Sequence, residues 1–245
     1  MHIASAIFDC SAPDLASCPD ESLPEFAFIG RSNVGKSSLL NMLAGKQGLA
    51  RVSTTPGFTK LINIFKMNKT WRLVDLPGYG YAHVARKDKA LFNEAVVDYL
   101  QQRPNLCRVF ALIDSCLPPQ PIDLEFIHWL AVNAIPFVLV YTKTDRVKPE
   151  LAAENMAAFN AGIAEWCQPL PPTFTSSGTT GQGRTELLAM IQEIVTEVQR
   201  EAKVKAETAP PPPEPEELPE KLPPIGRGMP IRATHAKKHN PARPW

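Results

Sequence analysis

Residues 26–37 read Phe-Ala-Phe-Ile-Gly-Arg-Ser-Asn-Val-Gly-Lys-Ser, an apolar run followed by a glycine-rich loop of the form G-x-x-x-x-G-K-[ST]. The apolar run is typical of a buried strand, and residues 38–43 begin a helical pattern. A strand, a loop and a helix in this order form a phosphate-binding loop, in which backbone N–H groups point at an anion. The stretch therefore predicts an α/β fold that binds a nucleotide.

Two side chains of this loop have defined tasks in such a site. Lys36 reaches the β- and γ-phosphates, and the Ser37 hydroxyl ligates Mg²⁺. The alternative, a glycine-rich surface turn, leaves the flanking strand and helix unexplained. The residues that we expect to contact the nucleotide here are Gly30, Arg31, Ser32, Asn33, Val34, Gly35, Lys36, Ser37 and Ser38.

Strand-like and helical patterns alternate outward from this loop as far as residue 200. We expect strands at residues 25–29, 61–66, 71–75, 108–114, 137–142 and 173–176. Helices are expected at residues 36–44, 89–102, 121–133, 149–166 and 184–200. Several strands are apolar throughout, which indicates burial on both faces. The prediction is a three-layer α/β domain with a mostly parallel sheet of about six strands flanked by helices.

Four regions are expected along the chain. Residues 1–24 form an N-terminal segment that can add an edge strand, and residues 25–200 form the nucleotide-binding domain. A proline- and glutamate-rich linker follows at residues 201–225, since eight prolines fall between positions 210 and 224. Residues 226–245 form a tail without acidic residues that we expect to be disordered, with basic residues Arg227, Arg232, Lys237, Lys238 and Arg243.

The composition is that of an ordinary globular protein, with 44% hydrophobic and 21% charged residues and a formal net charge of +1. No run of about 18 apolar residues occurs, and the first residues lack the pattern of a secretory signal. Five cysteines without C-x-x-C spacing argue against a metal site or a disulfide framework. A cytoplasmic protein is therefore expected.

A second nucleotide motif, Asp75-Leu76-Pro77-Gly78, stands at the end of a predicted strand. The Asp75 carboxylate can hold the Mg²⁺ shell through water, and the Gly78 N–H can meet the γ-phosphate. Taken alone, D-x-x-G also occurs in strand-end turns. Its position after the phosphate-binding loop favours the nucleotide role for residues 75–78.

A third motif, Thr142-Lys143-Thr144-Asp145, follows another predicted strand and selects the base. The Asp145 carboxylate can accept hydrogen bonds from both N1–H and the exocyclic amine of guanine, a donor pair that adenine lacks. The Lys143 stem can lie over the base plane. A charged loop after a strand is the alternative. Backbone N–H groups for the guanine oxygen are expected in Thr175-Ser176-Ser177-Gly178, at the end of the last predicted strand.

A switch loop is expected between the first two motifs. It includes Gly57, Phe58, Thr59 and Lys60, which we expect to close over the γ-phosphate. One threonine of this loop would be the second Mg²⁺ ligand. From the residues alone, Thr54 and Thr55 compete with Thr59 for this role.

The motifs together resemble those of translation-factor-type P-loop GTPases, and within them the EngB (YihA/YsxC) family of bacterial ribosome-biogenesis GTP-binding proteins. The specific mark is the extension Gly78-Tyr79-Gly80-Tyr81-Ala82, together with Tyr99, Leu100 and Arg103. The resemblance covers residues 20–200 and implies a P-loop GTPase domain that binds GTP and Mg²⁺ and hydrolyses GTP slowly. It also implies a role in assembly of the large ribosomal subunit, with septation and cell division as associated processes. It places the second Mg²⁺ ligand at Thr59. Thr144 and Phe58 depart from the family's usual residues at these positions.

Catalysis is expected from Lys36, Thr59 and Gly78, whereas the position where many GTPases carry a water-orienting Gln holds Tyr79. A phenol cannot replace that amide, so we expect slow intrinsic turnover that a partner or a cation accelerates. In related GTPases an Asn at the position of Asn33 can ligate K⁺. The alternative is an Asn that a strained loop tolerates.

Both the resemblance and the distribution of charge predict binding partners. GTP or GDP and the precursor of the large ribosomal subunit are the expected partners of a monomeric protein that does not bind membranes. Contacts with rRNA phosphates are expected from Arg86, Lys87 and Lys89 and from the five basic tail residues, although charged surface residues often only face solvent. A P-loop kinase of small-molecule metabolism and a proline-rich adaptor are the competing functions.

Overall fold

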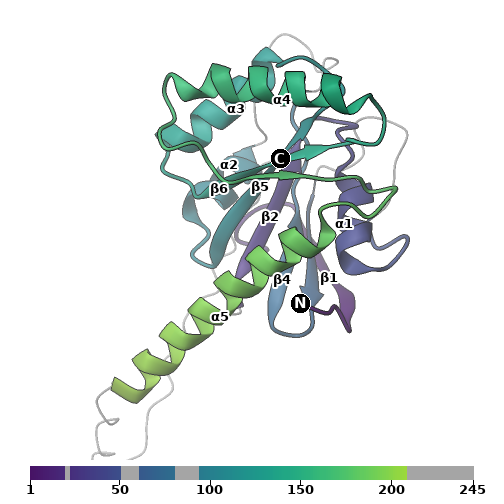
Figure 1. The fold of residues 1–245 in the computed structure, drawn as a ribbon. Coiled ribbons are helices and arrows are strands. Elements are labelled where there is room, and N and C mark those ends of the chain that lie inside the picture. Colours follow the sequence, from purple (N-terminus) through teal and green to yellow (C-terminus); the bar gives the residue numbers. More distant parts are fainter. Residues whose placement is uncertain (20–22, 51–60, 81–93, 209–245) are drawn as a thin grey trace, which may run out of the picture. The chain divides into compact units, whose positions relative to one another are not determined.

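The computed structural model describes residues 1–19, 23–50, 61–80 and 94–208. The chain divides into two compact units, Met1–Glu207 and Thr208–Trp245. The first unit contains a seven-stranded sheet whose spatial order is β1-β3-β4-β2-β5-β6-β7 (Figure 1). The strands are β1 (Ala6–Ala12), β2 (Glu25–Gly30), β3 (Ile62–Met67), β4 (Trp71–Asp75), β5 (Leu106–Asp114), β6 (Phe137–Thr142) and β7 (Thr173–Thr175).

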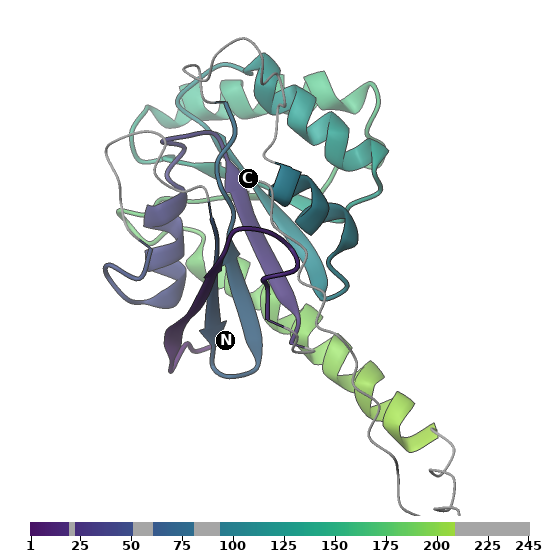
Figure 2. The ribbon, with the colours of Figure 1, turned by 180° about the vertical axis from the view of Figure 1, so that it is seen from behind.

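The sheet is mostly parallel. Strands β4, β2, β5, β6 and β7 pair in parallel, whereas β1 and β3 pair antiparallel, as do β3 and β4. β1 lies at the edge of the sheet beside β3, in dark purple in Figure 2, with a register shift between Phe8 and Cys10. The parallel part is buried on both faces, as its continuous apolar strands predict.

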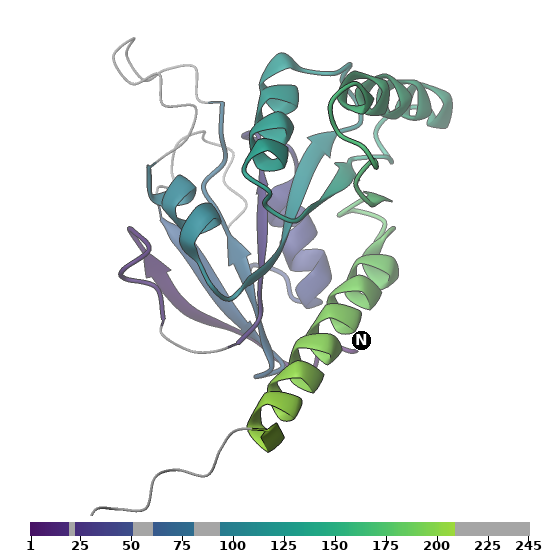
Figure 3. The same ribbon diagram turned by 90° about the vertical axis from the view of Figure 1, so that its left-hand side faces the viewer.

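Helices cover both faces of this sheet, as Figure 3 shows. One buried cluster joins the sheet to the apolar sides of three helices, and a second cluster joins its other face to the remaining two. Neighbouring strand residues alternate between the clusters: Ile29 belongs to the first and Phe28 to the second. The first cluster takes α2 (Glu94–Gln102), α3 (Pro121–Val132) and α4 (Pro149–Ala164); the second takes α1 (Lys36–Ala44) and α5 (Arg184–Thr208).

The three-layer α/β fold with a mostly parallel sheet confirms the predicted fold class. β1 is the edge strand that the N-terminal segment can add, and it brings the six other predicted strands to seven. Strand and helix ends agree with the expected ones to within about two residues. The exception is α5, which runs to Thr208 rather than ending at residue 200. Residues 201–208 contain alanine, glutamate and lysine, which favour helix, and the proline run begins only after them. Residues 89–93 of the expected helix 89–102 lie outside the described residues.

The register brings the ends of four strands together. β2 pairs Phe28 with Asp75 of β4, β2 pairs Gly30 with Leu112 of β5, and β5 pairs Asp114 with Thr142 of β6. The carboxyl ends of parallel strands meet at one edge of a sheet, where ligands of such folds usually bind. The three predicted motifs of the described region therefore share one edge.

Candidate nucleotide-binding site

The glycine-rich loop joins β2 to α1, because β2 ends at Gly30 and α1 begins at Lys36. Gly35 has φ of 103°, a left-handed conformation that strains any residue with a side chain. A Cβ on Gly30 would lie 2.8 Å from the carbonyl oxygen of Leu112 in the neighbouring strand. Both glycines of the motif are therefore required by the local geometry.

Lys36 and Asp75 meet beside this loop. Lys36 Nζ forms an ion pair with Asp75 Oδ1, and only 13% and 8% of the two side chains are exposed. Asp75 ends β4, the parallel neighbour of β2, which brings the carboxylate next to the first turn of α1. Lys36, which we expect at the phosphates, and Asp75, which we expect at the metal ion, are therefore in direct contact.

The oxygen atoms at this place suit Mg²⁺. Ser37, the second residue of α1, is half-buried, and its hydroxyl and the Asp75 carboxylate are both hard oxygen donors. Within the described part of the chain no three His, Cys, Asp or Glu residues gather into a metal-binding group.

The Thr142–Asp145 motif is fixed to the glycine-rich loop. Thr142 Oγ1 donates to the Val34 carbonyl at 2.5 Å and lies 3.2 Å from the Ile113 carbonyl. Lys143 has φ of 61°, and its Nζ donates to Asp114 Oδ2 at 2.6 Å. A Cβ on Gly35 would lie 3.7 Å from Cε and Cγ of Lys143, so the lysine stem runs along the loop.

A pocket opens between this motif and the loop after β7. Asp145 is exposed at its rim, and a hydrogen bond from Ser177 lowers the pKa of its carboxyl, so that it is ionised at neutral pH. Ser176 Oγ is buried and has no hydrogen-bond partner among the described residues. A buried hydroxyl in that condition fits a site that receives a polar ligand. The pocket is lined by Gly35, Ser38, Leu39, Thr142, Lys143, Asp145, Arg146, Ser176, Gly178 and Thr179.

Several predicted residues support this pocket without lining it. Thr144 Oγ1 lies 3.2 Å from the Ser176 carbonyl and 2.9 Å from Gln182 Oε1, so this threonine links the loop after β6 to the loop after β7. Ser177 Oγ accepts from the N–H groups of Thr179 and Thr180 at 3.2 and 3.0 Å. Thr175, Leu76 and Pro77 likewise do not line the pocket, and the last two are buried.

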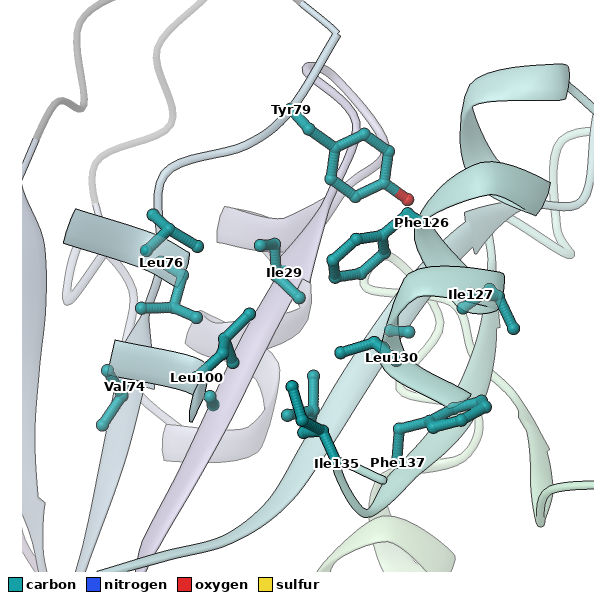
Figure 4. Close-up of a cluster of buried hydrophobic side chains, with 14 of the residues drawn as sticks. Ile29, Val74, Leu76, Tyr79, Leu100, Phe126, Ile127, Leu130, Ile135 and Phe137 are labelled. Carbon is teal, nitrogen blue, oxygen red and sulfur yellow. The ribbon is translucent and has the colours of Figure 1, made fainter. Parts of the chain in front are cut away.

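The side chains of Arg31 and Tyr79 turn to Asp123 of α3 rather than to the pocket. Arg31 Nε donates to Asp123 Oδ2 at 2.9 Å, and the Tyr79 hydroxyl donates to Asp123 Oδ1 at 3.0 Å. What Arg31 offers to the predicted site is therefore its backbone. Tyr79 is 4% exposed and lies among the apolar residues of the first cluster (Figure 4).

Three pocket-lining residues were not among the predicted site residues: Leu39, Arg146 and Thr179. Each lies within a few positions of a predicted motif. Closeness to a motif is therefore the one feature of the sequence that could have pointed to these residues. Gly178 is required because a Cβ there would lie 2.8 Å from the Cβ of Ser38. The predicted switch residues Gly57, Phe58, Thr59 and Lys60, and the basic residues Arg86, Lys87 and Lys89, lie outside the described residues, as does the whole tail.

The fold and these motifs define a P-loop GTP-binding protein with a GTPase domain. Residues 25–143 match the family model described as "50S ribosome-binding GTPase". The probable GTP-binding protein EngB of Bacteroides fragilis is 47% identical over 198 residues, which cover 81% of this chain and 98% of that protein. The probable EngB of Bacteroides thetaiotaomicron is 48% identical with the same coverage. The chain belongs to the EngB family of GTP-binding proteins, which confirms the resemblance.

Solved structures agree on the fold. A crystal structure of a probable GTP-binding protein EngB superposes with a TM-score of 0.56 at 24% identity, over 71% of this chain and 99% of that one. Era, in complex with MgGDPNP and nucleotides 1506–1542 of 16S ribosomal RNA, gives a TM-score of 0.53 at 22% identity, over 70% of this chain and 56% of that one. In the described ranges of this chain, none of the helices has the length and apolar character needed to span a membrane.

Proposed function

We propose that this protein is a GTP-dependent molecular switch of the cytoplasm that acts, as a monomer, in assembly of the large ribosomal subunit. The main support for a nucleotide site is that its predicted parts lie together. The Lys36–Asp75 ion pair and the pocket at Asp145 are at the same edge of the sheet. The ribosomal role is supported by the words of the matching family model.

The phosphates would bind at the loop between β2 and α1. The Ser32 and Val34 N–H groups already donate to the Tyr79 and Arg31 carbonyls, so other N–H groups of the loop and of the first turn of α1 would face the anion. Lys36 would exchange Asp75 for the β- and γ-phosphates. Mg²⁺, held by Ser37, Thr59 and, through water, Asp75, would supply charge neutralisation on those phosphates. Gly78 would donate its N–H to the γ-phosphate.

The base would bind in the pocket. Asp145 would accept both guanine donors, and the Ser176 hydroxyl would face the guanine oxygen. The N–H groups of Ser176 and Ser177, which the sequence predicted for this contact, donate instead to the Tyr141 and Gln182 carbonyls. Lys143 would cover the base plane with its stem, because Asp114 holds its ammonium group at 2.6 Å. ATP would leave the Asp145 carboxylate without the donor pair that guanine provides, at a cost of about 1–3 kcal/mol for each unpaired group.

Hydrolysis would be slow without help. The Tyr79 side chain is buried against Asp123, so it is not available to orient a water at the γ-phosphate. Asn33, exposed in the loop with φ of 64°, is the candidate ligand for an activating K⁺. A partner or a cation would therefore set the rate of turnover.

Ribosomal RNA would be bound by basic residues outside the described ranges. Arg86, Lys87 and Lys89 follow the Gly78 motif, and the tail carries five basic residues without an acid. Deleting residues 208–245 should weaken ribosome binding and reduce its dependence on salt, measured by co-sedimentation over a KCl series. An unchanged salt slope would show that the tail makes no RNA contact.

Two measurements test the proposal as a whole. Titration with fluorescent nucleotides should show binding of GTP and GDP and no competition by ATP. Co-sedimentation with large-subunit particles should then differ between GDP and a non-hydrolysable GTP analogue. Binding of ATP as strong as that of GTP would contradict the guanine site, and equal co-sedimentation in both nucleotide states would contradict the switch.

A further inference from the structure

A buried cluster of three side chains connects the phosphate-binding loop, the Gly78 motif and helix α3. Arg31 Nε donates to both carboxylate oxygens of Asp123, at 3.0 and 2.9 Å. The Tyr79 hydroxyl donates to Asp123 Oδ1 at 3.0 Å. Asp123 is 1% exposed, so its carboxylate is compensated by a cation from the loop and a hydroxyl from the neighbouring motif.

The Tyr79 side chain is fixed by a hydrogen bond at its hydroxyl and by a ring contact with α3. Its ring centroid lies 4.6 Å from that of Phe126, one turn further along α3 than Asp123, and Figure 4 shows the two rings packed together. Burial, with the Asp123 charge as a second cause, raises the pKa of the Tyr79 phenol well above its ordinary value, so the hydroxyl remains a donor. The side chain therefore acts as an anchor and not as an acid or a base.

The backbone around Tyr79 lies directly on the phosphate-binding loop. The Tyr79 N–H donates to the Gly30 carbonyl at 3.3 Å, and the Ser32 N–H donates to the Tyr79 carbonyl at 3.4 Å. A Cβ on Gly78 would lie 2.8 Å from the Gly30 oxygen. The Gly78 peptide is thus placed beside the loop by the residue that follows it.

We propose that Arg31, Asp123 and Tyr79 form a clamp that presets the Gly78 N–H for the γ-phosphate, so that Tyr79 is a positioning residue that favours GTP over GDP. The inference rests on the proposed role of Gly78. An N–H that is fixed before the ligand arrives does not have to be ordered on binding, and ordering one residue costs the equivalent of about a tenfold loss of affinity. GDP has no γ-phosphate to accept this N–H, so its affinity should depend on the clamp much less than that of GTP.

The test is the ratio of two affinities in one variant. Tyr79→Phe keeps the ring on Phe126 and removes only the hydroxyl. We expect the dissociation constant for a fluorescent non-hydrolysable GTP analogue to rise about three- to tenfold, since a hydrogen bond to a buried carboxylate is lost. The constant for the corresponding GDP should change by less than about twofold.

Tyr99→Phe is the matched control. The Tyr99 hydroxyl also donates to a buried carboxylate, Glu25 Oε2 at 2.7 Å, at the start of β2 and away from the phosphate-binding loop. Both variants lose the same kind of bond, so general loss of stability would affect both alike. Only Tyr79→Phe should change the ratio of the two affinities.

Equal weakening of both nucleotides by Tyr79→Phe, or no weakening, would overturn the clamp. Asp123→Asn provides a second variant with the same expected change in ratio, and the double variant should show no further change if the three residues act together. Gly78→Ala separates this inference from the proposed function. If Gly78→Ala leaves binding of the GTP analogue unchanged, the role of Gly78 is wrong; if only Tyr79→Phe does so, the clamp alone is wrong.

Discussion

Glu25→Gln should destabilise the fold strongly while leaving the nucleotide motifs in place. Glu25 begins β2 and is wholly buried. Its carboxylate accepts from the Tyr99 hydroxyl at 2.7 Å, from Arg103 Nε and Nη2 at 2.9 and 2.7 Å, and from Arg72 Nη1 at 3.2 Å. The Glu25 carboxylate thus serves two guanidinium groups and a phenol, and Arg72 has a second anionic partner in Asp9, whose Oδ2 lies 3.3 Å from Arg72 Nε.

The size of the loss follows from the burial of the partners. The Arg72 and Arg103 side chains are 0% and 8% exposed, so water cannot replace the lost charge. Breaking a buried pair by neutralising one member costs about 3–5 kcal/mol. In a domain of this size each kcal/mol lowers the melting temperature by roughly 2–4 °C, so we expect a decrease of about 6–20 °C.

Thermal unfolding followed by circular dichroism measures this decrease. Glu193→Gln is the matched control, because Glu193 is exposed on α5 and the same substitution there should change stability by less than about 0.5 kcal/mol. If Glu25→Gln lowered the melting temperature no more than Glu193→Gln does, the buried network would not contribute to stability as reasoned above.

Three further predictions concern the proposed site. Asp145→Asn should weaken GDP binding by about tenfold or more and improve binding of xanthosine diphosphate, whose C2 oxygen accepts from the new amide; a fluorescence competition assay with both nucleotides checks this. Asp114→Asn should weaken GDP and GTP equally, by about fivefold, because the Lys143 ammonium loses its 2.6 Å partner and its stem covers a base common to both; a change for GTP alone would refute the assignment. GTP hydrolysis should be faster in KCl than in NaCl, and Asn33→Ala should remove the difference; equal rates of the unchanged protein in both salts would eliminate the potassium role.

The sequence predicted the local elements well because their signals are local. The apolar run 26–29 and the loop after it specify a strand and a phosphate-binding turn within a dozen residues. Continuous apolar strands indicated a parallel sheet covered on both faces, which the two buried clusters show. The end of α5 was placed eight residues too early, since the change in composition after residue 200 precedes the proline run that ends the helix.

The sequence predicted part of the lining of the proposed base pocket. Thr142, Lys143, Asp145 and Ser176 line it, and each belongs to a motif that follows a strand. Arg146 and Thr179 line the same pocket, yet no residue type marks them. Such residues line the pocket only because they stand next to a motif. Their residue types alone do not indicate that role in a single sequence.

Sequence by itself determined the class of ligand, the family and the alternation of strands and helices, because these depend on residues near one another in the chain. Only the tertiary structure decided which buried charges and hydroxyls are partners. Asp123 meets Arg31 across 92 positions and Tyr79 across 44, and Glu25 meets Arg103 across 78. Periodicity identifies a buried face, but the partners of a polar group on that face depend on the order in which strands assemble and on the helix that covers them. Tyr79, which the sequence shows only as the replacement of a glutamine, is therefore recognisable as an anchor only in the folded protein.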